Sequence, residues 1–407
     1  MNCRHCSTPL HRQFLDLGAA PPSNSYLTQD TLNQAETFYP LRLFVCDSCR
    51  LVQTEDFASA DTYFNSDYAY FSSTSSSWLD HAKRYATAMT DRFDLNASSF
   101  VIEVASNDGY LLKNFVQAGI PCLGVEPTKS TAEAAEAIGV PTLQEFFGED
   151  LGRKLAAEGK KADLIAGNNV YAHVPDINDF TLGIAQALKP EGVVTLEFPH
   201  LMRLVEFRQF DTVYHEHYSY LSLLVVSRIF KAAGLRVFDV EELSTHGGSL
   251  RVFGCLEASA RNQSDRVDQL LTEEIGRGMD DGDFYSAFQD QANQVKDGLV
   301  RFLLDEKAKG TTIAGYGAAA KGNTLLNYAG VRPDLLPYVC DAAPSKIGKF
   351  LPGSRIPILS PDVLTEKRPD VIVILPWNIA DEVMAQLSDL AEQGTRFVTA
   401  VPEIRVR

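Results

Sequence analysis

The chain has 407 residues, 45% of them hydrophobic, which is enough for two or three folded domains at about 150 residues per domain. Its 53 acidic and 37 basic side chains give a formal net charge of −16, which argues against a general binder of nucleic acid or of an anionic membrane. No apolar run approaches the roughly 18 residues that span a bilayer, and the first residues lack a hydrophobic signal core, so we expect a cytoplasmic protein.

Two Cys-x-x-Cys pairs stand within the first fifty residues, and the other three cysteines are scattered. Each pair can present two thiolates to one tetrahedral ion, and four soft sulfur ligands favour zinc. A redox-active pair and a chance spacing are the alternatives. About fifty residues bury little surface, so zinc would supply the missing stability around strand-like stretches such as 38–44. We predict a structural zinc site with four ligands, Cys3, Cys6, Cys46 and Cys49.

Residues 68–77 combine aromatic and hydroxyl side chains and are predicted to form a loop. An amphipathic helix should follow, because apolar side chains recur on one helical face. The face consists of Trp78, Ala82, Tyr85 and Met89. This stripe is most simply part of a core.

A strand, a turn and a helix are predicted over 99–116, and a second strand over 122–127 ends at Glu126. In open α/β sheets, an acid at the end of the second strand accepts hydrogen bonds from ribose hydroxyls. The turn lacks GxGxxG, so S-adenosylmethionine is favoured over NAD, with an ordinary βαβ unit as the alternative. Two more strands, over 162–170 and 192–199, predict one continuous parallel sheet. The candidate cofactor residues are Glu103, Ala105, Asn107, Asp108, Gly109, Glu126, Asn168 and Asn169.

The segment 210–220 concentrates titratable groups, among them Tyr214, His215, Glu216 and His217. An extended backbone would point the two histidines to one face, whereas a turn would rearrange them. Metal ligation by the two histidines lacks an identifiable third ligand, and a structural hydrogen-bond network is a further alternative. General acid/base chemistry is the preferred interpretation, because imidazole titrates near neutral pH. His173 follows a strand and is a candidate for the same cluster.

Long amphipathic helices over 267–302 are expected to bridge to a second α/β unit. There, residues 312–324 run from a strand through a glycine turn into a helix, where backbone amides and Lys321 could hold a phosphate. Strands over 339–341 and 371–378 would complete a Rossmann-like unit. Two such units would face each other across a cleft.

These motifs in succession resemble the sugar C-methyltransferases that act on nucleotide-linked 4-keto-deoxyhexoses at the third sugar carbon. The resemblance covers essentially the whole chain and rests on the paired cysteines, the loop of residues 103–109, the cluster of residues 214–217, the turn at 246–248 and the turn at 315–318. It implies an α/β protein with three parts. These are a zinc-binding domain (1–65), a class I S-adenosylmethionine-dependent methyltransferase domain (66–258) and a C-terminal Rossmann-like substrate-binding domain (259–407).

The resemblance also implies roles for individual residues. His217 would be the general base that forms an enolate next to the sugar ketone, with Tyr214, Glu216, His173 and a tyrosine of the 68–70 segment around it. Tyr68 is favoured over Tyr70 for that tyrosine. Substrate-binding candidates are His246, Gly247, Gly315, Tyr316, Gly317, Ala318, Lys321, Trp377 and Asn378. The expected partner is a nucleotide-linked 4-keto-deoxyhexose, whose pyrophosphate requires a local reversal of the negative net charge.

Two positions depart from the family pattern. Ala105 stands where such loops usually have glycine, and His215 stands where some relatives have an acid. Two other functions are weighed against the sugar C-methyltransferase. One is methylation of an oxygen or nitrogen on another sugar or natural product, and the other is a zinc-ribbon regulatory protein with a degenerate methyltransferase domain.

Overall fold

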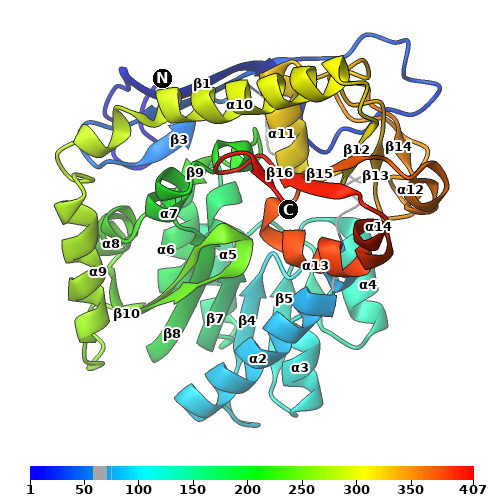
Figure 1. Ribbon diagram of the computed structural model, residues 1–407. Coiled ribbons are helices and arrows are strands. Elements are labelled where there is room, and N and C mark those ends of the chain that lie inside the picture. Colours follow the sequence, from blue (N-terminus) through cyan, green and yellow to red (C-terminus); the bar gives the residue numbers. More distant parts are fainter. Residues whose placement is uncertain (58–70, 75) are drawn as a thin grey trace.

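The computed structural model describes residues 1–57, 71–74 and 76–407, and Figure 1 shows their arrangement. The described residues form three sheets of four, seven and six strands. The four-stranded N-terminal sheet and a long helix lie along one side of the molecule, and the other two sheets lie beneath them in the view of Figure 1. Among the described residues, no helix is long and apolar enough to cross a membrane.

The N-terminal sheet is antiparallel and takes its last strand from far along the chain. Its order is β1 (Arg12–Ala20), β2 (Tyr39–Val45), β3 (Val52–Thr54) and β9 (Ser219–Tyr220). The strand expected over 38–44 is β2. Strand β9 directly follows the segment rich in titratable groups, so the N-terminal sheet is hydrogen-bonded to that segment.

The central sheet carries the predicted cofactor loop. Its order is β10 (Leu235–Leu243), β11 (Ser249–Leu256), β8 (Leu188–Pro199), β7 (Ala162–Asn168), β4 (Val101–Val104), β5 (Cys122–Val125) and β6 (Thr142–Leu143). The five strands from β8 to β6 are parallel, as expected. The prediction of one continuous parallel sheet is wrong, because β10 and β11 form an antiparallel hairpin and β11 pairs antiparallel with β8.

Helices cover the central sheet, and the first two of them lie where helices were predicted. They are α2 (Ser76–Phe93), α3 (Leu112–Gln117), α4 (Lys129–Ala137), α5 (Glu149–Ala157), α6 (Ile177–Ala187), α7 (Leu201–Glu206) and α8 (Leu223–Ala232). Three members of the α2 stripe, Ala82, Tyr85 and Met89, are buried. In α3, Leu112 and Phe115 are buried, whereas Val116 is 37% exposed.

The C-terminal sheet forms a second α/β unit. Its order is β14 (Ile358–Leu359), β13 (Val339–Cys340), β12 (Ile313–Tyr316), β15 (Val371–Ile374), β16 (Arg396–Thr399) and β17 (Arg405–Val406). All neighbours pair in parallel except β17. Its helices are α11 (Ala320–Ala329), α12 (Asp362–Lys367), α13 (Ala380–Gln386) and α14 (Ser388–Glu392).

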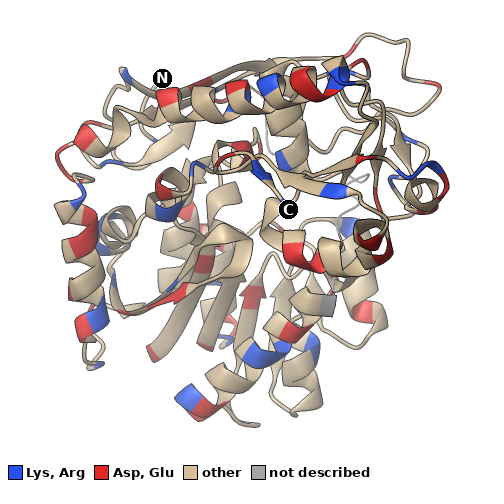
Figure 2. Ribbon diagram, viewed as in Figure 1, with Lys and Arg blue, Asp and Glu red and all other residues tan. Residues whose placement is uncertain are grey.

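Two helices connect the central and C-terminal units. Helix α9 (Asp265–Gly276) runs beside the central sheet, and α10 (Phe288–Ala308) runs along β1, as Figure 1 shows. The Phe14 ring of β1 stacks on Phe288 of α10 at 5.0 Å between ring centroids. Figure 2 shows both signs of charge interleaved along α9 and α10, the pattern of solvated helix faces.

The N-terminal unit also contacts the C-terminal unit directly. Leu27 and Phe350 exchange two backbone hydrogen bonds, and the Tyr26 hydroxyl donates to the carbonyl of Ala318 at 2.6 Å. The zinc-binding unit is therefore attached to both of the other units.

Candidate functional site

The four predicted metal ligands converge at the start of the N-terminal sheet. One ligand atom from each of Cys3, Cys6, Cys46 and Cys49 lies within 4.8 Å of every other. Cys3 Sγ is 3.4 Å from Cys49 Sγ, and Cys6 Sγ is 3.5 Å from Cys46 Sγ. These separations approach the roughly 3.8 Å between sulfurs that bind one tetrahedral zinc ion through bonds of about 2.3 Å. The donor set therefore fits zinc, and four thiolates leave no open coordination position for substrate.

The predicted cofactor loop follows β4 and has an unusual backbone. Ala105, Asn107 and Gly109 have φ angles of +55°, +49° and +76°, all in the left-handed region. A Cβ at Gly109 would lie 3.0 Å from a methyl group of Val140 and within 3.3 Å of Ala135. Glycine adopts positive φ without the steric cost of about 1–2 kcal/mol that other residues incur. The backbone thus explains why glycine is usual at position 105, and alanine accepts strain there.

Three acids surround this loop. Glu103 is 1% exposed, and burial together with the charges of Glu126 and Asp108 raises its pKa well above the ordinary value. The Glu126 carboxylate accepts hydrogen bonds from the backbone amides of Asn107 at 2.9 Å and Thr128 at 2.8 Å. Glu126 thus binds the backbone of the loop from just after β5, and its hydrogen bonds to ribose hydroxyls stay a prediction.

Buried acceptor atoms without a protein partner gather at this edge of the sheet. Among the described residues, Glu103 Oε2, Asp108 Oδ1, Asn168 Oδ1 and Asn169 Oδ1 are buried and accept no hydrogen bond. Unpaired buried acceptors are costly unless a ligand supplies donors. The ammonium group, the ribose hydroxyls and the adenine amino group of S-adenosylmethionine are such donors. The residues present therefore fit this cofactor.

An aromatic stack connects the start of α2 with the turn at 246–248. Trp78 stacks on His81 at 4.8 Å and lies tilted against His246 at 5.4 Å between ring centroids. The Asn169 side-chain nitrogen is 3.3 Å from Nε2 of His246. The candidate substrate residue His246 therefore lies beside the cofactor edge of the sheet.

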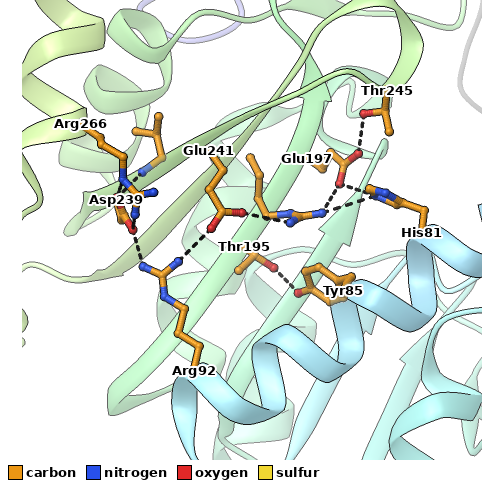
Figure 3. A network of polar contacts seen from close by, with 11 residues as sticks. His81, Tyr85, Arg92, Thr195, Glu197, Asp239, Glu241, Thr245 and Arg266 are labelled. Atoms are coloured by element: carbon orange, nitrogen blue, oxygen red, sulfur yellow. Dashed lines mark hydrogen bonds and ion pairs between the residues drawn. The ribbon is translucent and has the colours of Figure 1, made fainter.

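A buried ionic network supports this turn from below (Figure 3). Glu197 is fully buried at the end of β8 and binds His81 Nε2 at 3.0 Å, Arg251 at 2.8 Å and the Thr245 hydroxyl at 3.0 Å. Burial acts to raise the pKa of Glu197. Hydrogen bonds and charges from His81 and Arg251 act more strongly in the opposite direction, so the pKa of Glu197 is lowered. Sequence analysis missed this network, because its members come from strands and a helix that are far apart in the chain.

The proton-transfer segment forms a turn rather than an extended strand. The amide of His217 donates to the carbonyl of Tyr214 at 3.2 Å, which brings the two rings to 4.6 Å. The His173 ring lies 4.5 Å from the His217 ring, at an angle of 81° between planes. His215 points elsewhere, with its Nε2 at 3.2 Å from the carbonyl of Tyr39. The structure thus brings Tyr214, His217 and His173 together and separates His215 from them.

Both clustered histidines are held in the neutral form. Burial lowers the pKa of His173 to about 4, and burial and the neighbouring His173 lower the pKa of His217 well below its ordinary value. His173 Nδ1 lies 3.0 Å from the carbonyl of Glu216 and donates to it in the neutral ring. A hydrogen bond to the backbone of Thr212 acts against the lowering at His217. Each ring therefore has one nitrogen engaged by a backbone carbonyl.

Glu216 faces the N-terminal unit. Its carboxylate accepts a hydrogen bond from the Asn24 side chain at 3.0 Å. Burial raises the pKa of Glu216 to about 7, although the Asn24 hydrogen bond acts to lower it. Burial, followed by the charges of Asp211 and Glu216, also raises the pKa of Tyr214 well above 10, so its hydroxyl stays protonated. Tyr68 and Tyr70, the other two predicted members of the cluster, lie outside the described residues.

Three of the predicted substrate-binding residues lie together in the C-terminal unit and are called the wall below. They are Lys321, Trp377 and Asn378. Lys321, at the start of α11, is 9% exposed, and its Nζ lies 2.6 Å from Asn378 Oδ1 and 4.5 Å from the centroid of the Trp377 ring. A Cβ at Gly247 would lie 2.3 Å from the Trp377 ring, so the central and C-terminal units touch here without space for a side chain. The Trp377 indole donates to the buried Asp211 at 2.7 Å. Asp211 joins this wall although sequence analysis had not singled it out.

The other predicted substrate-binding residues of the C-terminal unit lie in β12 and in the turn after it, and only some of them lie in that turn. Gly317 has a φ of +87°, and a Cβ there would lie 2.4 Å from Pro376, so only glycine fits. The Ala318 amide donates to Asp341 at 2.7 Å. Gly315 is buried within β12, and Tyr316 packs in the C-terminal core with its hydroxyl 3.4 Å from Gln386. The structure thus does not bring Tyr316 to the wall that contains Lys321.

Comparison with known proteins identifies the family of the chain. Family models match residues 3–64 as a zinc binding domain, residues 78–240 as a methyltransferase domain and residues 244–402 as a C-methyltransferase C-terminal domain. The C-methyltransferase NovU of Streptomyces niveus is 34% identical over 407 residues, which are 99% of this chain and 96% of NovU. The chain belongs to this C-methyltransferase family.

Two solved structures are similar to part of the C-methyltransferase at low identity. Magnesium protoporphyrin IX methyltransferase from Synechocystis, solved with bound SAH, is 14% identical with a TM-score of 0.34, and the match covers 43% of this chain and 82% of that one. The PH0226 protein from Pyrococcus horikoshii is 14% identical with a TM-score of 0.39, and the match covers 48% and 98%. The family models and the relative NovU, and not these distant structures, show that the chain is an S-adenosylmethionine-dependent C-methyltransferase with a zinc-binding domain. The four clustered cysteines are suitable ligands for the zinc ion.

Proposed function

We propose that this C-methyltransferase methylates the third sugar carbon of a nucleotide-linked 4-keto-6-deoxyhexose through an enolate. The observation that carries the proposal is the cluster of His217, His173 and Tyr214. His217 is close enough to His246, at the cofactor edge, for the two to interact electrostatically, and Tyr214 interacts in the same way with Asp211, the hydrogen-bond partner of Trp377. The methyl group of a sulfonium is electrophilic, so the carbon that accepts it must be nucleophilic, and loss of an acidic C–H proton is one way to make it so. A ketone at the neighbouring carbon provides that acidity.

His217 is the proposed base. Its neutral ring has one nitrogen free to take the C-3 proton, because the other is hydrogen-bonded to the backbone of Thr212. The electron pair of the C–H bond then forms the enolate, whose negative charge lies on the ketone oxygen. The Tyr214 hydroxyl stays protonated and is suited to donate a hydrogen bond to that oxygen. S-Adenosylmethionine supplies the electrophilic methyl group.

The test is incubation of the enzyme with methyl-labelled S-adenosylmethionine and a set of nucleotide 4-keto-6-deoxyhexoses. We expect label on C-3 of at least one sugar, located by NMR. Label on an oxygen or nitrogen would contradict the proposal, as would the absence of transfer to every sugar from an enzyme that binds the cofactor. In deuterated solvent, the C-3 proton should exchange even when the cofactor is replaced by its demethylated product.

We expect Lys321→Gln to weaken binding of the sugar nucleotide specifically. A hydrogen bond to a charged group contributes about 1.5–3 kcal/mol, which corresponds to about a 10- to 150-fold higher KM for the sugar nucleotide. The KM for S-adenosylmethionine should change by less than about twofold, since the partners of Lys321 are Asn378 and Trp377 and not residues of the cofactor loop. Lys367→Gln is the matched control, because Lys367 is exposed and packs over Tyr338, away from this wall. Equal KM values in the two variants would remove Lys321 from the binding site.

A further inference from the structure

Arg4 stands between the metal-binding residues Cys3 and Cys6, and its side chain is only 6% exposed. All three guanidinium nitrogens are hydrogen-bonded. Nε donates to the carbonyl of Tyr218 at 3.2 Å, Nη1 to the carbonyl of Pro175 at 3.1 Å, and Nη2 to the carbonyl of Thr54 at 3.0 Å and to Asp56 at 2.5 Å. The buried guanidinium of Arg4 thus donates hydrogen bonds to backbone carbonyls in three separate segments of the chain.

Two of those segments carry the clustered histidines. Tyr218 directly follows His217, and Pro175 lies two residues after His173. The third segment reinforces the first, because the Thr54 amide donates to the carbonyl of Tyr218 at 3.2 Å and the Thr54 hydroxyl donates to the carbonyl of His217 at 3.1 Å. The guanidinium therefore sets the spacing between the two backbone segments that present the imidazole rings.

The backbone of Arg4 is itself held in place on two sides. Its amide donates to the Gln53 side chain at 2.9 Å, and its carbonyl accepts from the Asn178 side chain at 3.2 Å. The Asn178 Oδ1 accepts a hydrogen bond from His5 Nδ1 at 2.8 Å, which ties the Cys3–Cys6 loop, called the zinc-binding knuckle below, to α6. A zinc ion bound by Cys3 and Cys6 would fix the same short loop from within.

We propose that Arg4 is a positioning residue for the catalytic histidines, and that the zinc-binding knuckle acts on the reaction through it. The inference rests on the proposed function, since it takes His217 to be the base. An arginine suits this task better than a lysine, because its planar fork reaches several carbonyls in fixed directions, whereas an ammonium group is a single point. A displacement of about 1 Å at a reacting group can cost about 10²-fold in rate.

The experiment compares Arg4→Lys with Arg12→Lys and Asp56→Asn in the full-length zinc-loaded enzyme. Arg12 also belongs to the N-terminal unit but is 45% exposed and pairs with Asp47. Asp56→Asn removes the charged partner of Arg4 and leaves its three carbonyl bonds. We expect Arg4→Lys to lower kcat by about 10- to 100-fold. The KM values, zinc content and cofactor affinity should stay within about twofold of the wild type, and both control variants should retain wild-type kcat.

A second readout needs no substrate. The imidazole titrations of His173 and His217 are followed by NMR and assigned with His173→Asn and His217→Asn. In Arg4→Lys both titrations should move toward the ordinary histidine pKa, because a loosened pocket admits water. Unchanged titrations with unchanged kcat would overturn the inference, and so would loss of zinc or cofactor binding in parallel with kcat. If wild-type enzyme transfers no methyl group to C-3, the proposed function fails, and the titrations still decide whether Arg4 positions the two rings.

Discussion

Replacing His217 by asparagine should lower kcat by about 10²- to 10⁴-fold, the usual contribution of a general base. Affinities for cofactor and sugar nucleotide should change little, because asparagine can still hydrogen-bond to the backbone of Thr212 and leaves the turn from Tyr214 intact. Solvent exchange of the C-3 proton should disappear together with methyl transfer. Stopped-flow or quenched assays at saturating substrate measure the first effect, and NMR in deuterated solvent measures the second.

The pH dependence of the wild type follows from the same residue. The base acts in its neutral form, and burial lowers its pKa well below 6.5, so the neutral form persists into acid solution. We expect kcat/KM to remain on its plateau below pH 6.5 and to fall only as pH approaches the lowered pKa. His215→Asn is the matched control, because His215 faces the carbonyl of Tyr39 instead of the cluster. Retained proton exchange in His217→Asn would place the base elsewhere.

Replacing Cys49 by serine should abolish stable zinc binding and disrupt the N-terminal sheet. Structural zinc sites in small domains contribute apparent binding free energies of about 10–16 kcal/mol, so the loss of one of four thiolates removes a large part of the stability of this unit. Because β3 pairs with β9 next to His217, we expect turnover to fall with the metal content. Elemental analysis and thermal unfolding measure the two effects.

Cys340→Ala is the control for the zinc prediction. Cys340 is a buried cysteine of the C-terminal sheet and lies outside the metal cluster. This variant should retain zinc and lose only the stability expected of a small cavity, about 1–2 kcal/mol. If Cys49→Ser keeps its zinc and its unfolding temperature, the four-cysteine site is not what stabilises the N-terminal sheet.

Local patterns were sufficient to predict the elements that position the cofactor loop. The stripe through Ala82, Tyr85 and Met89 predicted α2, and the run into Glu103 predicted β4, because both periodicities are written in consecutive residues. The antiparallel place of β11 was not predicted, since strand pairing is a long-range choice that the residues of one strand do not encode.

The candidate site could also be predicted only in part. Tyr214 and His217 are close in the sequence and are recognisable as candidates, but the sequence is compatible with both an extended strand and a turn between them. Tyr316 shares the sequence motif of its neighbours, yet its strand position turns the side chain into the C-terminal core. Arg4 had no signal, because its partners are backbone carbonyls, which look alike in every residue.

The pairing of β3 with β9 has a consequence for how the chain is made. Val52 pairs with Tyr220 across about 170 residues, so a ribosome adding about 5–20 residues per second needs roughly 8–34 s to deliver the second strand after the first. During that interval the zinc-binding segment is exposed on the nascent chain with the edge of β3 unpaired. The four cysteines can bind their metal long before β9 is synthesised. The metal-bound knuckle would then hold β3 in place, so that β9, together with the catalytic turn before it, pairs with a strand that is already folded.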